Sequence, residues 1–512
     1  MTKSDERKSG AILSYVSIIL STLVQLIYTP LLIRMLGQSE YGLYSLVSSI
    51  IGYLTVLDLG FGNAIVIFTA KYRAQKKYDE EKKLHGMFFV VYFVIGIVAG
   101  IIGIILYFFV PIMFGASMSD VEIGKMKTMM LILAFNLAIT FIFSIYSSII
   151  NAYEKFTFQK IMSILNTVMK PLIMIPLLFL GFKSITMCVV ITIVNIIVLI
   201  SNYLYCKNKL NIKIKFLGFD KTLFKTIINY SFFIFLGVIV DKINWSVDQF
   251  VLGAISGTVA VAIYNVASQI NILFINLSTA ISGVLLPKMS KLVASHATND
   301  ELTNEFIKVG RIQYFIVFFM ASSLVIFGKE FILFWVGEDY ILSYYIAMIL
   351  ILPLCFSLIQ NLGISIRQAM NKHKFAAFLN IVVAAFNLII SIFLAKKFGA
   401  IGAALGTALG IIISIIVIDI YYQKIIKLNI IKFFKEICKL TLTFLLPIII
   451  IILLKRFIQL QGLLYLIVFG GTYFVIYSIN AYFISMNKYE KNIVNKILQK
   501  FMRCKNEVKK FE

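Results

Sequence analysis

The sequence predicts an all-α membrane protein of about fourteen transmembrane helices, and three observations support this fold class. Apolar residues make up 60% of the 512-residue chain. Charged residues make up only 14%, whereas a soluble domain has about a quarter. The apolar residues form long continuous runs, unlike the alternating strands of about ten residues in a membrane β-barrel. A soluble fold of this composition would expose large apolar patches and aggregate.

Each apolar run is long enough for the roughly 20 residues that a helix needs to cross the hydrocarbon core. The first run follows a short charged segment and is too long for a cleavable signal peptide. The expected spans are 10–33, 43–69, 87–113, 128–150, 161–181, 186–206, 227–255, 259–286, 312–336, 343–366, 376–395, 401–421, 438–454 and 462–485.

The distribution of Lys and Arg predicts the orientation. With the N-terminus placed inside, the inner segments carry 37 basic residues and the outer loops carry 9. Basic residues collect on the cytoplasmic side of membrane proteins, so both termini are expected in the cytoplasm. The net charge of +24 is spread over many short loops, which argues against nucleic-acid binding and suits anionic membrane lipids.

Two sets of residues recur at a nearly constant spacing, which predicts an internal repeat. Gly37, Tyr44, Ser48 and Ile50 recur 220 residues later as Gly257, Tyr264, Ser268 and Ile270, and Ala152, Lys155 and Phe158 recur 217 residues later as Ala369, Lys372 and Phe375. Six helices return the chain to the same side, so the copies would be parallel repeats. We expect an N-terminal lobe (1–206), a cytoplasmic linker (207–226), a C-terminal lobe (227–421), two additional helices (422–485) and a basic cytoplasmic tail (486–512).

Charged side chains inside the spans are the first candidates for a functional site. An ionised group at the bilayer centre costs about 2.5–3.5 kcal/mol, and such residues usually mark substrate or ion pathways. The deep charges are Asp58, Lys170, Asp241, Lys242 and Asp248. Structural pairing, for example of Asp58 with Lys170, is the open alternative. Arg34 and Arg367 lie near span ends, where snorkelling to the interface would also explain them.

Uncharged polar residues at spacings of three and four form stripes on several predicted helices. The candidates for lining a central cleft are Gln25, Tyr28, Asn136, Asn244, Asn265, Gln269 and Asn361. They would contact a hydrophilic ligand or hold helices together at about 0.6 kcal/mol each.

Motifs for catalysis and cofactor binding are missing from the sequence. His85, His296 and His373 are expected in solvated loops, and no cysteines have metal-ligand spacing. Neither a phosphate-binding loop for ATP nor a nucleophile motif occurs. We therefore expect a transporter without a cofactor or a metal. Uphill transport would then need an Na⁺ or H⁺ gradient, with Asp58, Asp241 and Asp248 as the coupling carboxylates.

Several segments, taken in order along the chain, resemble the polysaccharide biosynthesis flippases, which export lipid-linked O-antigen, capsule or exopolysaccharide repeat units. These segments are 34–44 (RMLGQSEYGLY), 57–64 (LDLGFGNA), 152–156 (AYEKF), 248–253 (DQFVLG) with 262–267 (AIYNVA), and 397–404 (KFGAIGAA). The resemblance implies two pseudo-symmetric six-helix bundles that form a V-shaped cleft, as in multidrug and toxin extrusion proteins and the lipid II flippase.

The same resemblance implies the cargo and its location. An undecaprenyl-diphosphate-linked oligosaccharide would move from the inner to the outer leaflet of the bacterial cytoplasmic membrane. The cations Lys170, Lys242, Arg34 and Arg367 would face the diphosphate, and the polar stripes and tyrosines would face the glycan. One chain would form the transport unit, together with polysaccharide assembly proteins.

Two other functions stay open at this point. A cation-coupled multidrug exporter of the same fold would bind Na⁺ or H⁺ at the deep carboxylates, although the cleft cations disfavour a cationic drug. A membrane polysaccharide polymerase is less favoured, because the outer loops are too short to build an external catalytic domain.

Overall fold

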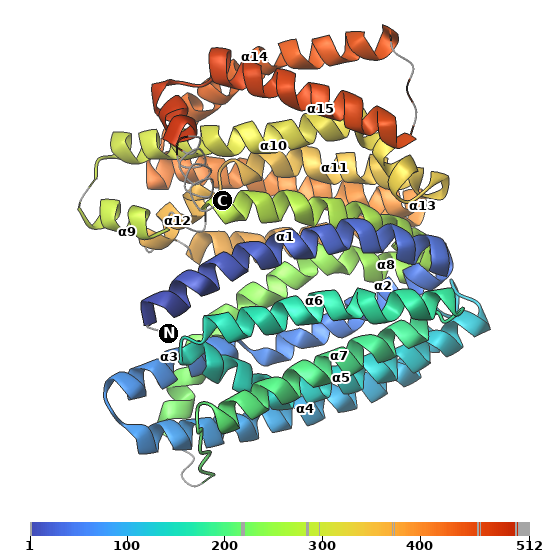
Figure 1. Ribbon diagram of the computed structural model, residues 1–512, viewed down its shortest axis with the longest axis vertical. Coiled ribbons are helices and arrows are strands. Elements are labelled where there is room, and N and C mark those ends of the chain that lie inside the picture. The colour runs from blue at the N-terminus through green and yellow to red at the C-terminus, as the bar shows by residue number, and fades with distance from the viewer. Residues whose placement is uncertain are drawn as a thin grey trace, which may run out of the picture. The chain divides into compact units, whose positions relative to one another are not determined.

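The computed structural model describes residues 3–216, 221–282, 286–295, 297–370, 372, 374–457, 460, 462–496 and 499. These residues are helical with short turns and contain no strand, which confirms the all-α class. The elements, in chain order (Figure 1), are α1 (Lys3–Leu36), α2 (Gln38–Leu54), η1 (Thr55–Asp58), α3 (Phe61–Ala74), α4 (Tyr78–Phe114), α5 (Asp120–Ala152), α6 (Phe156–Phe179), α7 (Ser184–Asn208), α8 (Lys221–Ser282), α9 (Leu286–Ala294), α10 (Asn299–Trp335), η3 (Glu338–Tyr340), α11 (Ile341–Leu358), α12 (Leu362–Ala369), α13 (Lys374–Tyr421), η4 (Tyr422–Ile426), α14 (Ile430–Phe457), α15 (Gly462–Asn480) and η5 (Ala481–Ser485).

Twelve helices in the described part of the chain are long and apolar enough to cross a membrane. One of them, Lys374–Ile426, has 53 residues and would be about 80 Å long, far more than a hydrocarbon core of about 30 Å. It contains a backbone break at Gly399 (φ 56°), and α8 contains one at Gly257 (φ 79°). Each break falls between two predicted spans. The count of fourteen crossings stays a prediction.

Two predicted spans are not continuous helices. The span 43–69 is interrupted by the 3₁₀ turn η1, after which Leu59 and Gly60 adopt left-handed conformations. The span 343–366 is interrupted between α11 and α12, where the amides of Asn361 and Gly363 bond to carbonyls three residues back. Each of these two predicted spans therefore contains two helical segments separated by a short turn. Irregular backbone at membrane depth is tolerated where it is buried in protein or lines a polar cavity.

The described residues fall into two compact units. One lies within Met1–Val266 and Ala384–Thr407, and the other lies within Ala267–Val383 and Ala408–Glu512. In the first unit α4, α5 and α7 run side by side (Figure 1). Gly96 and Gly103 of α4 lie against Ala138 and Ala134 of α5, and small residues of this kind allow close helix packing in membranes. The outward face of α4 is apolar, with Phe108 66% and Ile112 79% exposed, and suits contact with lipid.

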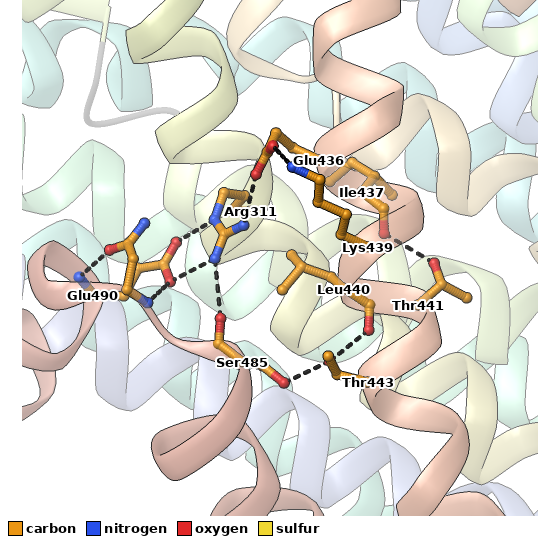
Figure 2. Close-up of polar contacts among 10 residues, drawn as sticks. Arg311, Glu436, Ile437, Lys439, Leu440, Thr441, Thr443, Ser485 and Glu490 are labelled. Atoms are coloured by element: carbon orange, nitrogen blue, oxygen red, sulfur yellow. Dashed lines mark hydrogen bonds and ion pairs between the residues drawn. The ribbon is translucent and has the colours of Figure 1, made fainter.

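In the second unit α14 and α15 pack against α10, and the buried Arg311 of α10 bonds to α14, to η5 and to the segment that follows η5 (Figure 2). Arg311 of α10 donates from Nε to Glu490 Oε1 at 2.6 Å and from Nη2 to Glu490 Oε2 at 3.0 Å. Nη2 also donates to the Ser485 carbonyl at 3.1 Å, and Nη1 lies 3.4 Å from Glu436 of α14. The two helices that the sequence suggested as an addition are therefore bonded to a helix of the predicted C-terminal lobe.

Candidate functional site

A buried cluster of oxygen atoms surrounds Asp248 in the first unit. Asp248 lies on α8 and is only 4% exposed. Its Oδ2 accepts hydrogen bonds from the Tyr264 hydroxyl and from Thr407 Oγ1, the latter at 2.6 Å. Asn387 Oδ1 lies 3.1 Å from Thr407 Oγ1 and accepts from Ser391 Oγ at 2.9 Å. Helix α8 supplies two of these side chains, and α13 supplies three.

The Asp248 cluster has the chemistry of a site for a hard cation. Its donor atoms are all oxygens, which hard cations prefer, and a single carboxylate supplies the charge. Asp248 Oδ1 is buried and makes no hydrogen bond with any described residue, so one ligand oxygen stays available. In the described part of the chain no three His, Cys, Asp or Glu side chains gather into a metal site. The cluster therefore suits Na⁺ or a proton better than a transition metal.

The sequence identified Asp248 but missed most of its partners. Asn387 and Ser391 are four residues apart and share one helix face, which was the available signal. Thr407 is a neutral residue in an apolar run and gave none. Tyr264 appeared in the sequence only as a member of the repeat and as one of the tyrosines expected to face the glycan.

Asp58 takes a different role from the ion pair that the sequence left open. It lies in η1, where Tyr92 of α4 donates to its Oδ1 at 2.7 Å. The backbone amides of Gly60 and Gly62 also hydrogen-bond to its carboxylate. Among the described residues, neither Asp58 nor any other carboxylate pairs with Lys170, which is half-buried on α6. Asp58 thus stabilises the helix break before α3.

The remaining predicted residues are dispersed over several helices. Lys242 of α8 lies against Gly52 of α2. Asn136 Oδ1 accepts from Asn195 at 2.7 Å, and Asn265 Oδ1 accepts from the Tyr41 hydroxyl at 2.7 Å. Arg34 is exposed at the end of α1, and Gln25, Tyr28 and Gln269 are half-buried. The side chains of Asp241 and Asn244, together with His296 and His373, lie outside the described residues.

His85 does not lie in a loop, as the sequence suggested. It is 1% exposed on α4, and its Nε2 lies 3.1 Å from Thr69 Oγ1. Helix α4 begins at Tyr78, before the apolar run that defined the predicted span. The charged first turns of this helix concealed its true start.

A small polar pocket brings Asn361 and Arg367 together in the second unit. Ser357, Gln360 and Asn361, at and just before the break between α11 and α12, line this pocket together with Arg367. The pocket has a volume of about 160 Å³ and also contacts Asn380, Ser414 and Tyr422 of the following helices. Asn361 Nδ2 donates to Ser278 Oγ at 2.8 Å, which fixes one wall.

A larger apolar pocket lies between α10, α11 and α14 in the same unit. Its volume is about 610 Å³, and carbon atoms of residues such as Phe318, Val325, Leu352, Phe356 and Leu442 form most of its lining. Burying apolar surface here would gain about 25 cal/mol for each Å² removed from water. The pocket suits a hydrocarbon chain.

Comparison with known proteins identifies the family. The family model described as "Polysaccharide biosynthesis protein" matches residues 8–293, more than half of the chain. The chain belongs to this family. The resemblance drawn from the sequence segments is therefore confirmed.

A curated relative and two solved structures agree with the membrane fold of this chain. A protein of Shigella flexneri named "Putative O-antigen transporter" is 22% identical over 395 residues, which cover 75% of this chain and 90% of that protein. A solved lipid II flippase in an inward closed conformation gives a TM-score of 0.72 at 20% identity, covering 92% of this chain and 97% of that one. An inward-facing multidrug resistance transporter of the MATE family gives 0.66 at 12% identity, covering 79% and 96%. The chain is thus a multi-pass membrane protein with the fold of these two solved structures.

Proposed function

We propose that this protein is a flippase for a lipid-linked oligosaccharide in cell-surface polysaccharide biosynthesis. The observation that carries the proposal is the family match over residues 8–293 in a chain with twelve candidate spans. The relative named as an O-antigen transporter and the lipid II flippase fold support it. In detail, an undecaprenyl-diphosphate-linked repeat unit moves from the cytoplasmic to the outer leaflet of the bacterial cytoplasmic membrane by alternating access.

The proposed cargo needs both apolar and polar surfaces on the protein. The 610 Å³ pocket between α10, α11 and α14 offers a carbon lining for part of the polyprenyl chain. The diphosphate needs hydrogen-bond donors and positive charge between the helices, which the chain supplies at Asn361 and Arg367. The protein acts as a transporter rather than an enzyme, as one chain with both termini in the cytoplasm, beside the polysaccharide assembly proteins.

The Asp248 cluster is the proposed site of energy coupling. A cation at Asp248 would take up the unpaired Oδ1 and reorient the hydroxyl groups of Tyr264 and Thr407. Because these residues come from α8 and α13, binding would change how the two helices pack. An Na⁺ or H⁺ gradient could then bias the transport cycle, since a ligand shifts an equilibrium by its differential affinity for two states.

Reconstituted proteoliposomes test the function and the coupling together. We expect undecaprenyl-diphosphate-linked oligosaccharide to reach the far leaflet, and a Na⁺ or H⁺ gradient to accelerate it. Asp248→Asn removes the only carboxylate of the cluster, so the gradient-driven initial rate should fall at least about tenfold, the loss of one charge-assisted contact. Lectin accessibility of the glycan reports the movement.

The controls separate the flippase from a drug exporter. Asp300→Asn alters an exposed carboxylate at the start of α10 and should keep the wild-type rate. Efflux of a cationic dye with a stationary glycolipid would reject the flippase proposal. A wild-type gradient response in Asp248→Asn would reject the coupling site alone.

A further inference from the structure

The pocket beside Arg367 contains hydrogen-bond donors that the protein itself does not satisfy. Arg367 Nε and Nη1 are buried and have no hydrogen-bond partner among the described residues. Gln360 Nε2, on the same pocket wall, is also buried and makes no hydrogen bond of normal geometry, although its side chain lies beside the Asp419 carboxylate. Unsatisfied buried polar groups are uncommon and destabilising, more so when they are charged. Three donors left unpaired around one cavity indicate a ligand that accepts hydrogen bonds.

The charge of Arg367 is not neutralised within the described part of the chain. Asp419, on the adjacent part of α13, forms no ion pair with it, and its own Oδ1 is buried and unpaired. Arg367 is half-buried, and the two nitrogens of its guanidinium that are buried have no counter-charge within ion-pair distance, which is unfavourable. A neutral sugar hydroxyl would leave this charge uncompensated, whereas an anion would compensate it.

The guanidinium is held in a fixed position by an aromatic ring. Its central carbon lies 5.4 Å from the ring centroid of Tyr422, a cation–π distance. Tyr422 is 2% exposed and packs edge-on against Phe306 at 5.9 Å. A side chain at Gly363 would collide with the Tyr422 hydroxyl, so glycine there lets the ring lie close. Tyr422 also begins the π-helical turn η4, an element frequent at functional sites.

The size of the pocket limits the ligand. Its 160 Å³ equals the liquid volume of about five water molecules. Pockets for drug-sized ligands begin at about 300 Å³, so an oligosaccharide does not fit, while a single phosphate group does. The fork of an arginine also matches the oxygens of phosphate in bidentate geometry.

We propose that the Arg367 pocket binds a phosphate-type oxyanion. If the proposed function is right, on which this part rests, the diphosphate of the lipid-linked cargo supplies that group while the polyprenyl chain lies in apolar surroundings. The headgroup of an anionic phospholipid offers the same chemistry. Gln360 donates the neutral hydrogen bond, and Arg367 provides the charge.

Calorimetric titration with inorganic diphosphate tests the site without any glycolipid. The protein is held in phosphatidylcholine nanodiscs, and wild type is expected to bind. Arg367→Gln should weaken binding at least about tenfold, and Arg367→Lys should weaken it less. Arg456→Gln is the matched control, because Arg456 is exposed at the end of α14. Should Arg367→Gln fail to fold by gel filtration, Gln360→Leu keeps the charge and should still weaken binding several-fold.

The outcomes separate the two phosphate sources and the two proposals. The titration is repeated in nanodiscs of phosphatidylglycerol. An unchanged diphosphate affinity indicates that the pocket binds the cargo diphosphate, whereas a weaker affinity indicates that the anionic lipid headgroup occupies the pocket. Equal affinities of wild type and Arg367→Gln, or no binding by wild type in phosphatidylcholine, would overturn the inference. Since no transport is measured, that result leaves the flippase proposal intact, and failed glycolipid transport leaves the pocket assignment intact.

Discussion

Arg311 shows how much a single buried cation can contribute to the stability of the second unit. Its side chain is 9% exposed and that of Glu490 only 2%. The two groups form a bidentate pair, which is the strongest geometry for arginine and a carboxylate. Breaking a buried pair from one side leaves an uncompensated charge, and this costs more than the pair contributes.

Arg311→Met should therefore destabilise the protein by about 3–5 kcal/mol, and its midpoint unfolding temperature in detergent should fall. Lys439→Met removes another cation from the same Glu436, but the Lys439 side chain is 62% exposed. Its loss should cost less than about 1 kcal/mol. Equal midpoints for the two variants would contradict the assigned role of Arg311.

At the residue scale, the sequence indicated the charged residues of the candidate sites better than the neutral residues that contact them. Asp248 stood out because a charge within an apolar run is costly, and Arg367 was a candidate although it lies near a span end. Thr407, Gln360 and Tyr422 have no such signature, and their importance depends on helices that are distant in sequence. Asp419 carried the same signal as Asp248 and was overlooked.

Glycine turns between helices explain two features of the elements. Gly37 separates α1 from α2 with φ 81° and ψ 167°, and Gly257 interrupts α8 with φ 79° and ψ −173°. This region of backbone space is essentially restricted to glycine. The shared conformation agrees with the predicted repeat, in which these two residues correspond. The division into six and six helices stays a prediction.

Gly257→Ala should destabilise the protein by about 1–3 kcal/mol, the cost of a strained backbone conformation. Its new Cβ would also lie 2.8 Å from the Ser117 carbonyl oxygen. Gly124→Ala is the control, because Gly124 lies inside helix α5 with open space around it, and alanine favours a helix. Thermal unfolding checks both variants, and a neutral Gly257→Ala would show that the turn tolerates a side chain.

The helix breaks mark the limit of prediction at the element scale. The polar residues at Thr55–Asp58 and at residues 359–361 are few and lie between long apolar stretches, so mean hydropathy gives no boundary there. Gly60 and Gly62 were available as signals at the first break. At the second break only Asn361 and Gln360 interrupt the apolar run, and their side chains acquire meaning only from the pocket they line.

At the scale of the whole molecule, the basic residues predict which ends of the helices face the cytoplasm. The fold class and the family followed from composition and short motifs, because they depend on features spread over the entire chain. Which segments belong to each of the two units could not be predicted in this way. That division depends on packing between residues far apart in the sequence, such as Asp248 and Thr407.

Cysteine labelling should locate three positions around α8 in a cysteine-free background. An impermeant maleimide on intact cells should label Ser256→Cys, which is exposed beside the Gly257 turn. Lys209→Cys and Asp300→Cys, both exposed, should react only after permeabilisation. This pattern requires two crossings within residues 221–282, as the count of fourteen predicts. Protection of Ser256→Cys on intact cells would contradict it.

The glycine turns also bear on how the chain is inserted during synthesis. Only Gly37 lies between the end of α1 and the start of α2, and α8 and α13 reverse without leaving a helical element. Such hairpins contain almost no hydrophilic loop that must be translocated across the bilayer. We expect each pair of helices to enter the lipid together, so the biosynthetic work of translocation is small for a protein that crosses the membrane so many times.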